Sequence, residues 1–236
     1  MIGCVGVGGV LLVPILAYLF NIPVHSAIAA AMFAYIFSGI VGTIIYARYG
    51  SIQWHMAFFI IVAAGPAAFA GAVAISVLPG IWLEILISSL IVSAGINSLR
   101  KREDAVQMLE PTPRGPTLAT IGAITGIGSA MTGTGGPLIL VPLAVWLGFP
   151  ALSAIGLSQA VQLPIALLAT AGNIIYGTVD WTISSILAAA IVFGAAIGAR
   201  LAHIVPQEQL RIILAWVLVI VGLFIVSRLT YSQIMS

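Results

Sequence analysis

The sequence predicts an all-α membrane protein that crosses the bilayer several times and is built from two related halves. Three observations lead to this fold class. Apolar residues make up 61% of the 236 residues and charged residues only 6%, whereas ordinary soluble domains carry about 25% charged residues. One long segment of the sequence occurs twice. Glycine clusters also interrupt apolar stretches that would otherwise form continuous helices.

The repeat extends along most of the chain. Residues 8–14 (GGVLLVP) return, lightly altered, as residues 135–142 (GGPLILVP). At an offset of 127 residues, Pro23 corresponds to Pro150 and Trp54 to Trp181. Secondary transporters are commonly built from two such repeats, with the substrate bound at the repeat interface.

We therefore expect a first transmembrane repeat over residues 1–100, a polar linker over 101–116 and a second repeat over 117–230. The linker follows a cationic run at Arg100–Arg102, which favours a cytoplasmic position. A spanning helix needs about 20 mainly apolar residues. Stretches of this kind are Pro23–Arg48, Trp54–Leu78, Ile81–Leu99, Pro150–Tyr176, Trp181–Ile204 and Gln207–Leu229, with Trp54, Trp82 and Trp181 at helix ends.

The segment Pro116–Gly148 is too long for one ordinary span. Glycines are expected to break it at Gly126–Ser129 and again at Gly133–Pro137. It is either one long interrupted helix or a re-entrant hairpin with glycines at its tip. A hairpin gives three crossings per copy and inverted repeats, and it places Arg48, Arg114, Arg200, Arg211 and the linker cations together on the cytoplasmic side. A straight span makes the repeats parallel and puts Arg200 and Arg211 outside, so the positive-inside tendency favours the hairpin.

The glycine clusters are the candidate substrate site. They expose backbone N–H groups that lipid cannot satisfy, so they must face protein or a water-filled site. Pro137 suits the first turn of a helix, whose N-terminus would offer free N–H groups and a positive dipole end to an anion. We expect contributions from Gly8 and Gly9 of the first copy and from Gly133, Thr134, Gly135 and Gly136 of the second. Close helix packing is the alternative role of such glycines.

The helix that follows carries a polar cluster, Ser158, Gln159 and Gln162, within an apolar span. Uncharged donors in a span usually face the bundle interior, so we expect these side chains to line the pocket. An ordinary interhelical hydrogen bond is the alternative. The corresponding first-copy residues are Ala31, Met32 and Tyr35. Asn173 is a weaker candidate because it lies nearer the end of the helix.

The charged residues argue against several other classes of function. Arg48, Glu84 and Asp180 fall at predicted helix boundaries, and no metal-ligand spacing is visible. We expect no metal, no cofactor, no nucleic-acid partner and no enzymatic activity. An intramembrane hydrolase would have to use Ser129 with His203, which is a poorly supported pair. An anion channel remains an alternative, because the same helix ends would also form a filter.

These motifs resemble the sulfite exporter TauE/SafE family, also called the toluene sulfonate uptake permease family. The resemblance rests on the doubled glycine–Val-Pro motif, on Gly-Phe-Pro-Ala-Leu-Ser-Ala at 148–154 and on the sequence Tyr176–Trp181. It implies a multi-pass carrier of a small sulfur-containing oxyanion, such as sulfite or an organosulfonate, in the inner membrane of a bacterium or archaeon. The partners expected are this anion and the lipid bilayer. Proton coupling and a homodimer are compatible with the sequence, which identifies neither.

Overall fold

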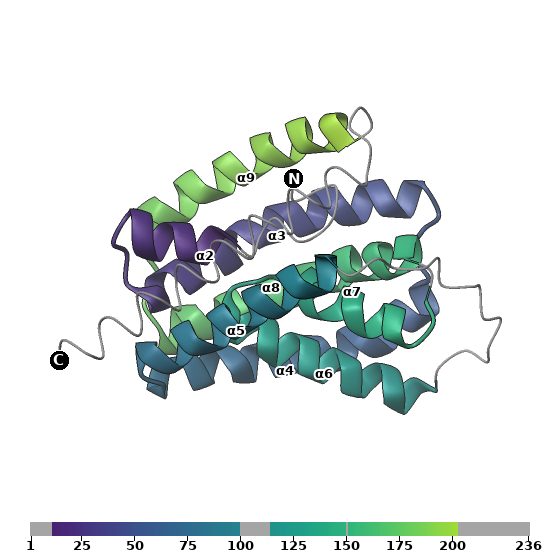
Figure 1. Ribbon diagram of the computed structural model, residues 1–236, viewed down its shortest axis with the longest axis horizontal. Helices are drawn as coiled ribbons and strands as arrows, with labels where there is room; N and C mark the ends of the chain where they lie inside the picture. Colours follow the sequence, from purple (N-terminus) through teal and green to yellow (C-terminus); the bar gives the residue numbers. More distant parts are fainter. Residues whose placement is uncertain (1–10, 100–113, 150, 203–236) are drawn as a thin grey trace.

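The protein is all-helical, as expected from the sequence. The computed structural model describes residues 11–99, 114–149 and 151–202, and every structural statement below concerns these residues. Gly8, Gly9 and the expected span Gln207–Leu229 lie outside them. In chain order the elements are α2 (Leu12–Pro14), a short π-helical turn η2 (Ile15–Leu19), α3 (Val24–Arg48), α4 (Trp54–Val77), α5 (Gly80–Leu99), α6 (Gly115–Thr132), α7 (Pro137–Trp146), α8 (Ala151–Tyr176) and α9 (Trp181–Ala202). The longer helices lie roughly along one axis (Figure 1).

Within the described ranges, three helices are long and apolar enough to cross a membrane: Val24–Arg48, Trp54–Val77 and Ser153–Tyr176. The apolar helices Gly80–Ser93 and Trp181–Gly194 are shorter. The predicted helix limits agree closely with the observed ones because Pro, Gly and Trp mark them in the sequence. Trp54, Trp82 and Trp181 lie exposed in the first turns of α4, α5 and α9, as interfacial aromatics do.

The bundle has two ends, which we name after Arg48 and Asp180. At the Arg48 end, α3 finishes, α4 begins and Gly156 of α8 lies against Ser51. At the Asp180 end, Ser26 near the start of α3 is within hydrogen-bonding distance of Thr178, which follows α8, with 3.4 Å between the two hydroxyl oxygens. Helices α3 and α8 therefore run antiparallel.

The segment containing α6 and α7 is a hairpin. Gly115 at the start of α6 lies beside Phe59 of α4, so α6 begins at the Arg48 end, and α8 begins at that end as well. The chain thus enters and leaves through one end, as Figure 1 shows. The first arm, α6, has 18 residues, or about 27 Å at 1.5 Å per residue. The second arm, α7, has 10 residues.

The expected break at Gly126–Ser129 is wrong, because α6 continues through Thr132. The glycines there serve close packing instead. A Cβ atom at Gly122 would collide with the backbone oxygen of Ile60, and one at Gly126 with that of Ala64. The missing side chains let α6 approach α4 to backbone contact without any loss of helical hydrogen bonds.

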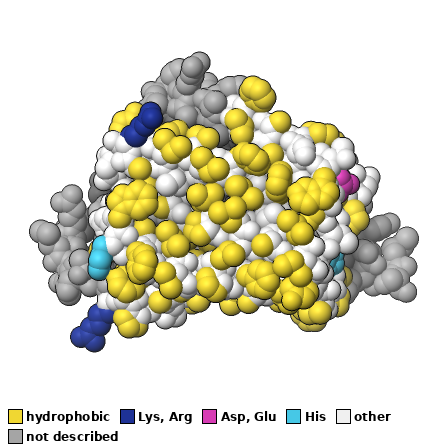
Figure 2. All heavy atoms as spheres, turned by 180° about the vertical axis from the view of Figure 1, so that it is seen from behind, with side chains coloured by type: hydrophobic (Ala, Val, Ile, Leu, Met, Phe, Trp, Pro, Cys, Tyr) yellow, Lys and Arg dark blue, Asp and Glu magenta, His cyan; other side chains and the backbone are white. Residues whose placement is uncertain are grey.

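Apolar side chains cover the broad face of the molecule in Figure 2, whereas Lys, Arg, Asp and Glu side chains appear only at its edges. The exposed apolar residues include Phe58, Leu167, Ile174 and Phe193. Patches of this size on a soluble protein would promote association. Here they fit a surface that is solvated by lipid chains.

We predict that Gly126→Val destabilises the bundle by about 1–3 kcal/mol, because the added side chain forces α6 away from the backbone of α4. The matched control is Gly194→Val in α9, where a Cβ would meet nothing within 4 Å. Thermal unfolding of the detergent-solubilised variants, followed by size-exclusion chromatography, measures the difference. Equal melting temperatures for the two variants would contradict the close α4–α6 contact.

Candidate functional site

The turn between α6 and α7 has a backbone that only glycine adopts easily. Gly133, Gly135 and Gly136 have φ angles of 68°, 76° and 113°, and L-residues with a side chain are strained in this region. The backbone N–H groups of Gly133 and Thr134 both donate to the Ser129 carbonyl, which ends α6. Gly136 caps α7 and its carbonyl accepts from Ile139 and Leu140. The sequence prediction of a helix break at Gly133–Pro137 is therefore confirmed.

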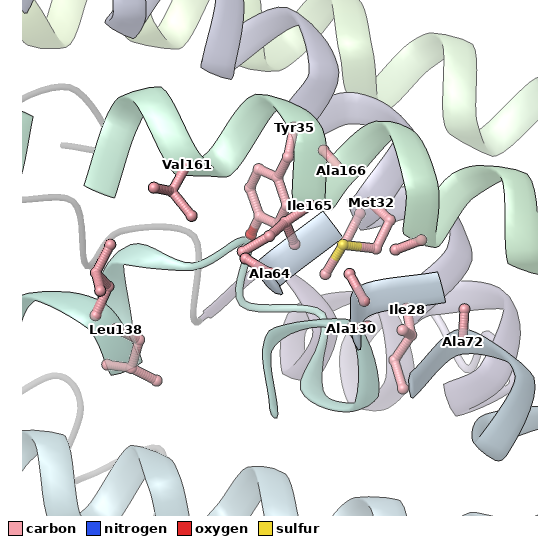
Figure 3. Close-up of a cluster of buried hydrophobic side chains, with 14 of the residues drawn as sticks. Ile28, Met32, Tyr35, Ala64, Ala72, Ala130, Leu138, Val161, Ile165 and Ala166 are labelled. Carbon is pink, nitrogen blue, oxygen red and sulfur yellow. The ribbon is translucent and has the colours of Figure 1, made fainter. Parts of the chain in front are cut away.

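The turn is enclosed between α3 and α8. A Cβ at Gly135 would lie 2.8 Å from the ring of Tyr35 on α3, and one at Gly136 would lie 3.8 Å from the Cα of Gln162 on α8. Tyr35 and Gln162 each lie about halfway along their helices. Figure 3 shows Tyr35, Ile165 and Met32 gathered close to this part of the chain. Gly135 and Gly136 are thus held near the middle of the bundle and shielded from lipid, whereas Gly133 lies against Ile28, nearer the Asp180 end.

Helix α7 directs its N-terminus into this enclosed region. Pro137 occupies the first helical position and has no N–H. Helix geometry gives the N–H of Leu138 no acceptor within the helix, and Gly135 and Gly136 bring their own N–H groups to the same place, whereas those of Gly133 and Thr134 are used by the Ser129 carbonyl. These donors and the positive end of the helix dipole make a site suited to an anion.

Gln162 supplies the one side-chain amide beside the turn. Its side chain is 2% exposed, and its Oε1 atom is buried without a hydrogen-bond partner. Buried polar atoms usually have partners, so this amide points to a group that binds there. A half-turn of the carboxamide exchanges its oxygen and nitrogen, and Gln162 is therefore equipped to donate to an anion.

The other two predicted polar residues lie nearer the Arg48 end. Ser158 is fully buried, and its hydroxyl donates to the Ile155 carbonyl at 2.7 Å. The amide of Gln159 lies against Gly42 of α3, where a Cβ atom would collide with its Oε1. Its backbone carbonyl accepts from the Thr43 hydroxyl at 3.1 Å. Of the three, Gln162 is the one that the structure brings beside the turn.

Hydroxyl groups extend from the turn along α6, and of these residues the sequence predicted only Thr134 as part of the site. Thr132 donates to the Gly128 carbonyl at 2.6 Å, and its Oγ1 lies 3.0 Å from that of Thr134. Thr125 and Ser129 are fully buried, and neither hydroxyl has a partner. Their i, i+4 spacing places them on one face, which was the signal available in the sequence.

The charged side chains with described positions lie away from the turn. Arg48, Arg114 and Asp180 are exposed. Asp180 caps α9 by accepting from the N–H groups of Thr182 and Ile183. Glu84, near the start of α5, accepts from the Tyr18 hydroxyl at 2.8 Å. The described residues contain no group of three His, Cys, Asp or Glu side chains able to hold a metal. Arg200 lies in the last turn of α9, and His203 lies outside the described residues.

Comparison with known proteins agrees with this architecture. The sequence model of the family described as "Sulfite exporter TauE/SafE" matches residues 1–225. The chain is 26% identical over 217 residues to "Probable membrane transporter protein YdhB" of Bacillus subtilis, with 89% of each chain covered. It is also 26% identical to "Probable membrane transporter protein MJ0441" of Methanocaldococcus jannaschii, covering 92% of this chain and 86% of that one.

No solved structure matches significantly. The family match covers nearly the whole chain, including both glycine–Val-Pro motifs and all described helices. The relatives are bacterial and archaeal membrane transporters by description. The chain therefore belongs to the TauE/SafE sulfite exporter family of membrane transporters, and it is not an enzyme.

Proposed function

We propose that this transporter carries a small sulfur-containing oxyanion, such as sulfite or an organosulfonate, across the inner membrane by alternating access. The observation that supports it most is the buried amide of Gln162 beside Gly136, whose Oε1 atom has no hydrogen-bond partner. The two residues lie beside each other at the N-terminus of α7, about halfway along the bundle. The site consists of Gly133, Thr134, Gly135, Gly136 and Gln162, with Ser158 and Gln159 on its Arg48 side.

The chemistry of this site favours a small oxyanion. Backbone N–H groups, hydroxyls and an amide are all hydrogen-bond donors, and oxyanions accept several such bonds at once. Described cationic side chains lie only at the Arg48 end, so the main chain and the helix dipole would have to balance the charge. Hydrogen bonds to charged groups each contribute about 1.5–3 kcal/mol. Three or four such bonds contribute about 4.5–12 kcal/mol, and the upper part of this range gives millimolar binding or tighter once an association cost of about 4 kcal/mol is subtracted.

We further propose that residues 1–100 and 117–230 are inverted repeats, joined by a cytoplasmic linker at 101–116. Helix α3 corresponds to α8 at the offset of 127 residues, and these two helices run antiparallel: Gly39 lies against Leu163 and Gly42 against Gln159. Tyr35 and Gln162 occupy equivalent positions and lie on either side of the turn. By the same offset, Gly8 and Gly9 would complete the site from the first repeat.

An anion channel is the second candidate, because the same donors would also form a selective constriction. The enclosed turn favours a carrier, since a channel needs a continuous water path when it conducts. Counterflow separates the two functions. A carrier exchanges labelled for unlabelled anion without net flux, whereas a channel dissipates the gradient.

The first test measures binding and counterflow of labelled sulfite, sulfate, taurine and a benzenesulfonate in proteoliposomes. We expect Gln162→Ala to weaken binding of the transported anion by about 10- to 100-fold, from the loss of one hydrogen bond to a charged group. Gln53→Ala is the matched control, because Gln53 is exposed at the N-cap of α4. Arg200→Ala should also bind normally if Arg200 is a cytoplasmic anchor. Loss of binding in Arg200→Ala with full binding in Gln162→Ala would refute this site.

The second test substitutes two glycines that share a positive φ. Gly136→Val and Gly148→Val should both lose stability, because φ is 113° at Gly136 and 88° at Gly148, a strain of order 1–3 kcal/mol. Only Gly136→Val should also abolish anion binding, since Gly148 lies between α7 and α8, away from the turn. Equal binding by the two variants at a temperature where both are folded would count against a main-chain anion site.

The third test concerns topology. In a Cys4→Ser background, Asp180→Cys should react with an impermeant thiol reagent from outside the cell, because the cations gather at the Arg48 end. Tyr49→Cys, in the exposed turn at that end, should react only in inverted vesicles. Labelling of both cysteines from the same side of the membrane would eliminate the inverted arrangement.

A further inference from the structure

Glu84 is the one acidic side chain among the described residues that lies between packed elements rather than at a helix cap. The other, Asp180, is exposed and caps α9. Glu84 lies about one turn from the start of α5, toward the Asp180 end, and is partly buried. Ionisable residues within a membrane segment are costly and generally have a function. The Glu84 carboxylate therefore requires an explanation that the oxyanion site does not give.

Glu84 forms a contact between α5 and the N-terminal elements. Its Oε2 atom accepts from the Tyr18 hydroxyl at 2.8 Å, and this contact is partly buried. Tyr18 belongs to the π-helical turn η2, a kind of turn that is rare and frequently lies at functional sites. A hollow of about 10 Å³ adjoins the pair, close to the minimum volume for one water molecule. Its other lining residues are apolar: Val13, Pro14, Ala17, Val24 and Ile87.

The same N-terminal elements reach the glycine turn. Val13 of α2 lines the hollow beside Glu84. Its side chain also lies against Gly133, where an added Cβ atom would collide with it. Helix α2 and η2 follow each other without a break, so Val13 and Tyr18 belong to one continuous piece of helical chain. A displacement of Tyr18 is therefore passed by this short segment to the first glycine of the turn.

Few other titratable or charged groups face Glu84. On α3 the titratable group at this end is His25, whose Nε2 donates to the Leu78 carbonyl at 3.0 Å. Its ring lies beside Gly80, about one turn before Glu84 on α5. Helix α6, which also contacts α5, contains no titratable side chain. Arg48 of α3 lies at the opposite end, so no Lys or Arg of these elements holds Glu84 in its ionised form.

We propose that Glu84 is the proton-binding site that couples proton and anion transport, and that Tyr18 and α2 connect it to the glycine turn. This inference rests on the proposed function. Ionised Glu84 accepts from Tyr18 and places a negative charge on the elements that hold the turn, which opposes anion binding. A hydronium ion at the Asp180 end gives its proton to a carboxylate oxygen and becomes water. The negative charge is then removed and the hold on η2 weakened.

Proton and anion therefore favour each other's binding, because coupling between two sites is reciprocal. Both leave at the other side of the membrane, where the carboxylic acid returns its proton to water. The two are thus transported in the same direction.

The first experiment measures the proton uptake that accompanies anion uptake into proteoliposomes. The vesicles contain a pH-sensitive dye, and potassium with valinomycin fixes the membrane potential, so that protons do not simply follow charge. Labelled sulfite, sulfate, taurine or a benzenesulfonate is supplied outside. Wild-type protein should acidify the interior as the transported anion enters. Glu84→Gln should lose this acidification, because an amide binds no proton near neutral pH, while anion counterflow changes less than about threefold.

Three further variants localise the effect. Asp180→Asn is the matched control, because it neutralises the other described carboxylate and Asn still caps a helix. It should acidify the interior like wild type. His25→Gln should do so as well, since the Gln amide also donates to a carbonyl. Tyr18→Phe removes the hydroxyl that links Glu84 to η2, so acidification per anion should fall although the carboxylate remains.

Persistent acidification in Glu84→Gln would overturn the proton site, and so would alkalinisation by wild type. Full acidification in Tyr18→Phe would overturn the connection through α2. Failure of the proposed function has a different signature, since wild-type protein would then take up none of the four anions.

A second experiment needs neither a variant nor a substrate. A hydrophobic carbodiimide reacts with protonated carboxyl groups, so mass spectrometry of labelled wild-type membranes should find it on Glu84 and not on Asp180. The labelled fraction should increase as the pH is lowered. A Glu84 side chain that stays unlabelled would overturn the proposal independently of any anion.

Discussion

The constraint on which this structure depends is that lipid offers the backbone no hydrogen bonds. A chain that breaks its helix inside a membrane must surround the break with protein. Here the break at Gly133–Gly136 is enclosed between α3 and α8, with Tyr35 on one side and Gln162 on the other. The two long helices are needed for enclosure as much as for spanning. The polar interior and the apolar exterior of α6 and α8 follow from the same requirement.

The sequence predicted most of the helices and their limits, because Pro, Gly and Trp mark the ends of apolar runs and because the chain carries too few charged residues for a soluble fold. It also predicted the turn, since four residues with three glycines before Pro137 permit no ordinary helix. It could not separate glycines that break a helix from glycines that pack one. Gly126 and Gly133 look alike in sequence, and only the nearness of the α4 backbone distinguishes Gly126.

For a related reason, the sequence predicted only part of the candidate site. Gln162 is a conspicuous polar residue in an apolar span, and it lies beside the turn as expected. Gln159 looks equivalent in sequence but lies against Gly42 of α3, because it lies about 60° around the helix and about 4.5 Å along it from Gln162 and therefore meets a different neighbour. The sequence did not assign Ser129 or Thr170 to the substrate site, because hydroxyls are common in helices that span membranes. Both hydroxyls are buried without a partner in the structure.

The glycine seam between α4 and α6 has a mechanical consequence. At Gly122 and Gly126 no side chains lie between α4 and α6 to slide or repack, so we expect these two helices to move together. Helix α7 is joined to this pair only through the glycines of the turn, whose left-handed torsions give it the freedom of a joint. Any rocking of the bundle would therefore be concentrated at the residues that we propose bind the anion. Residues 133–136 would then serve both as the hinge of the conformational change and as part of the proposed binding site.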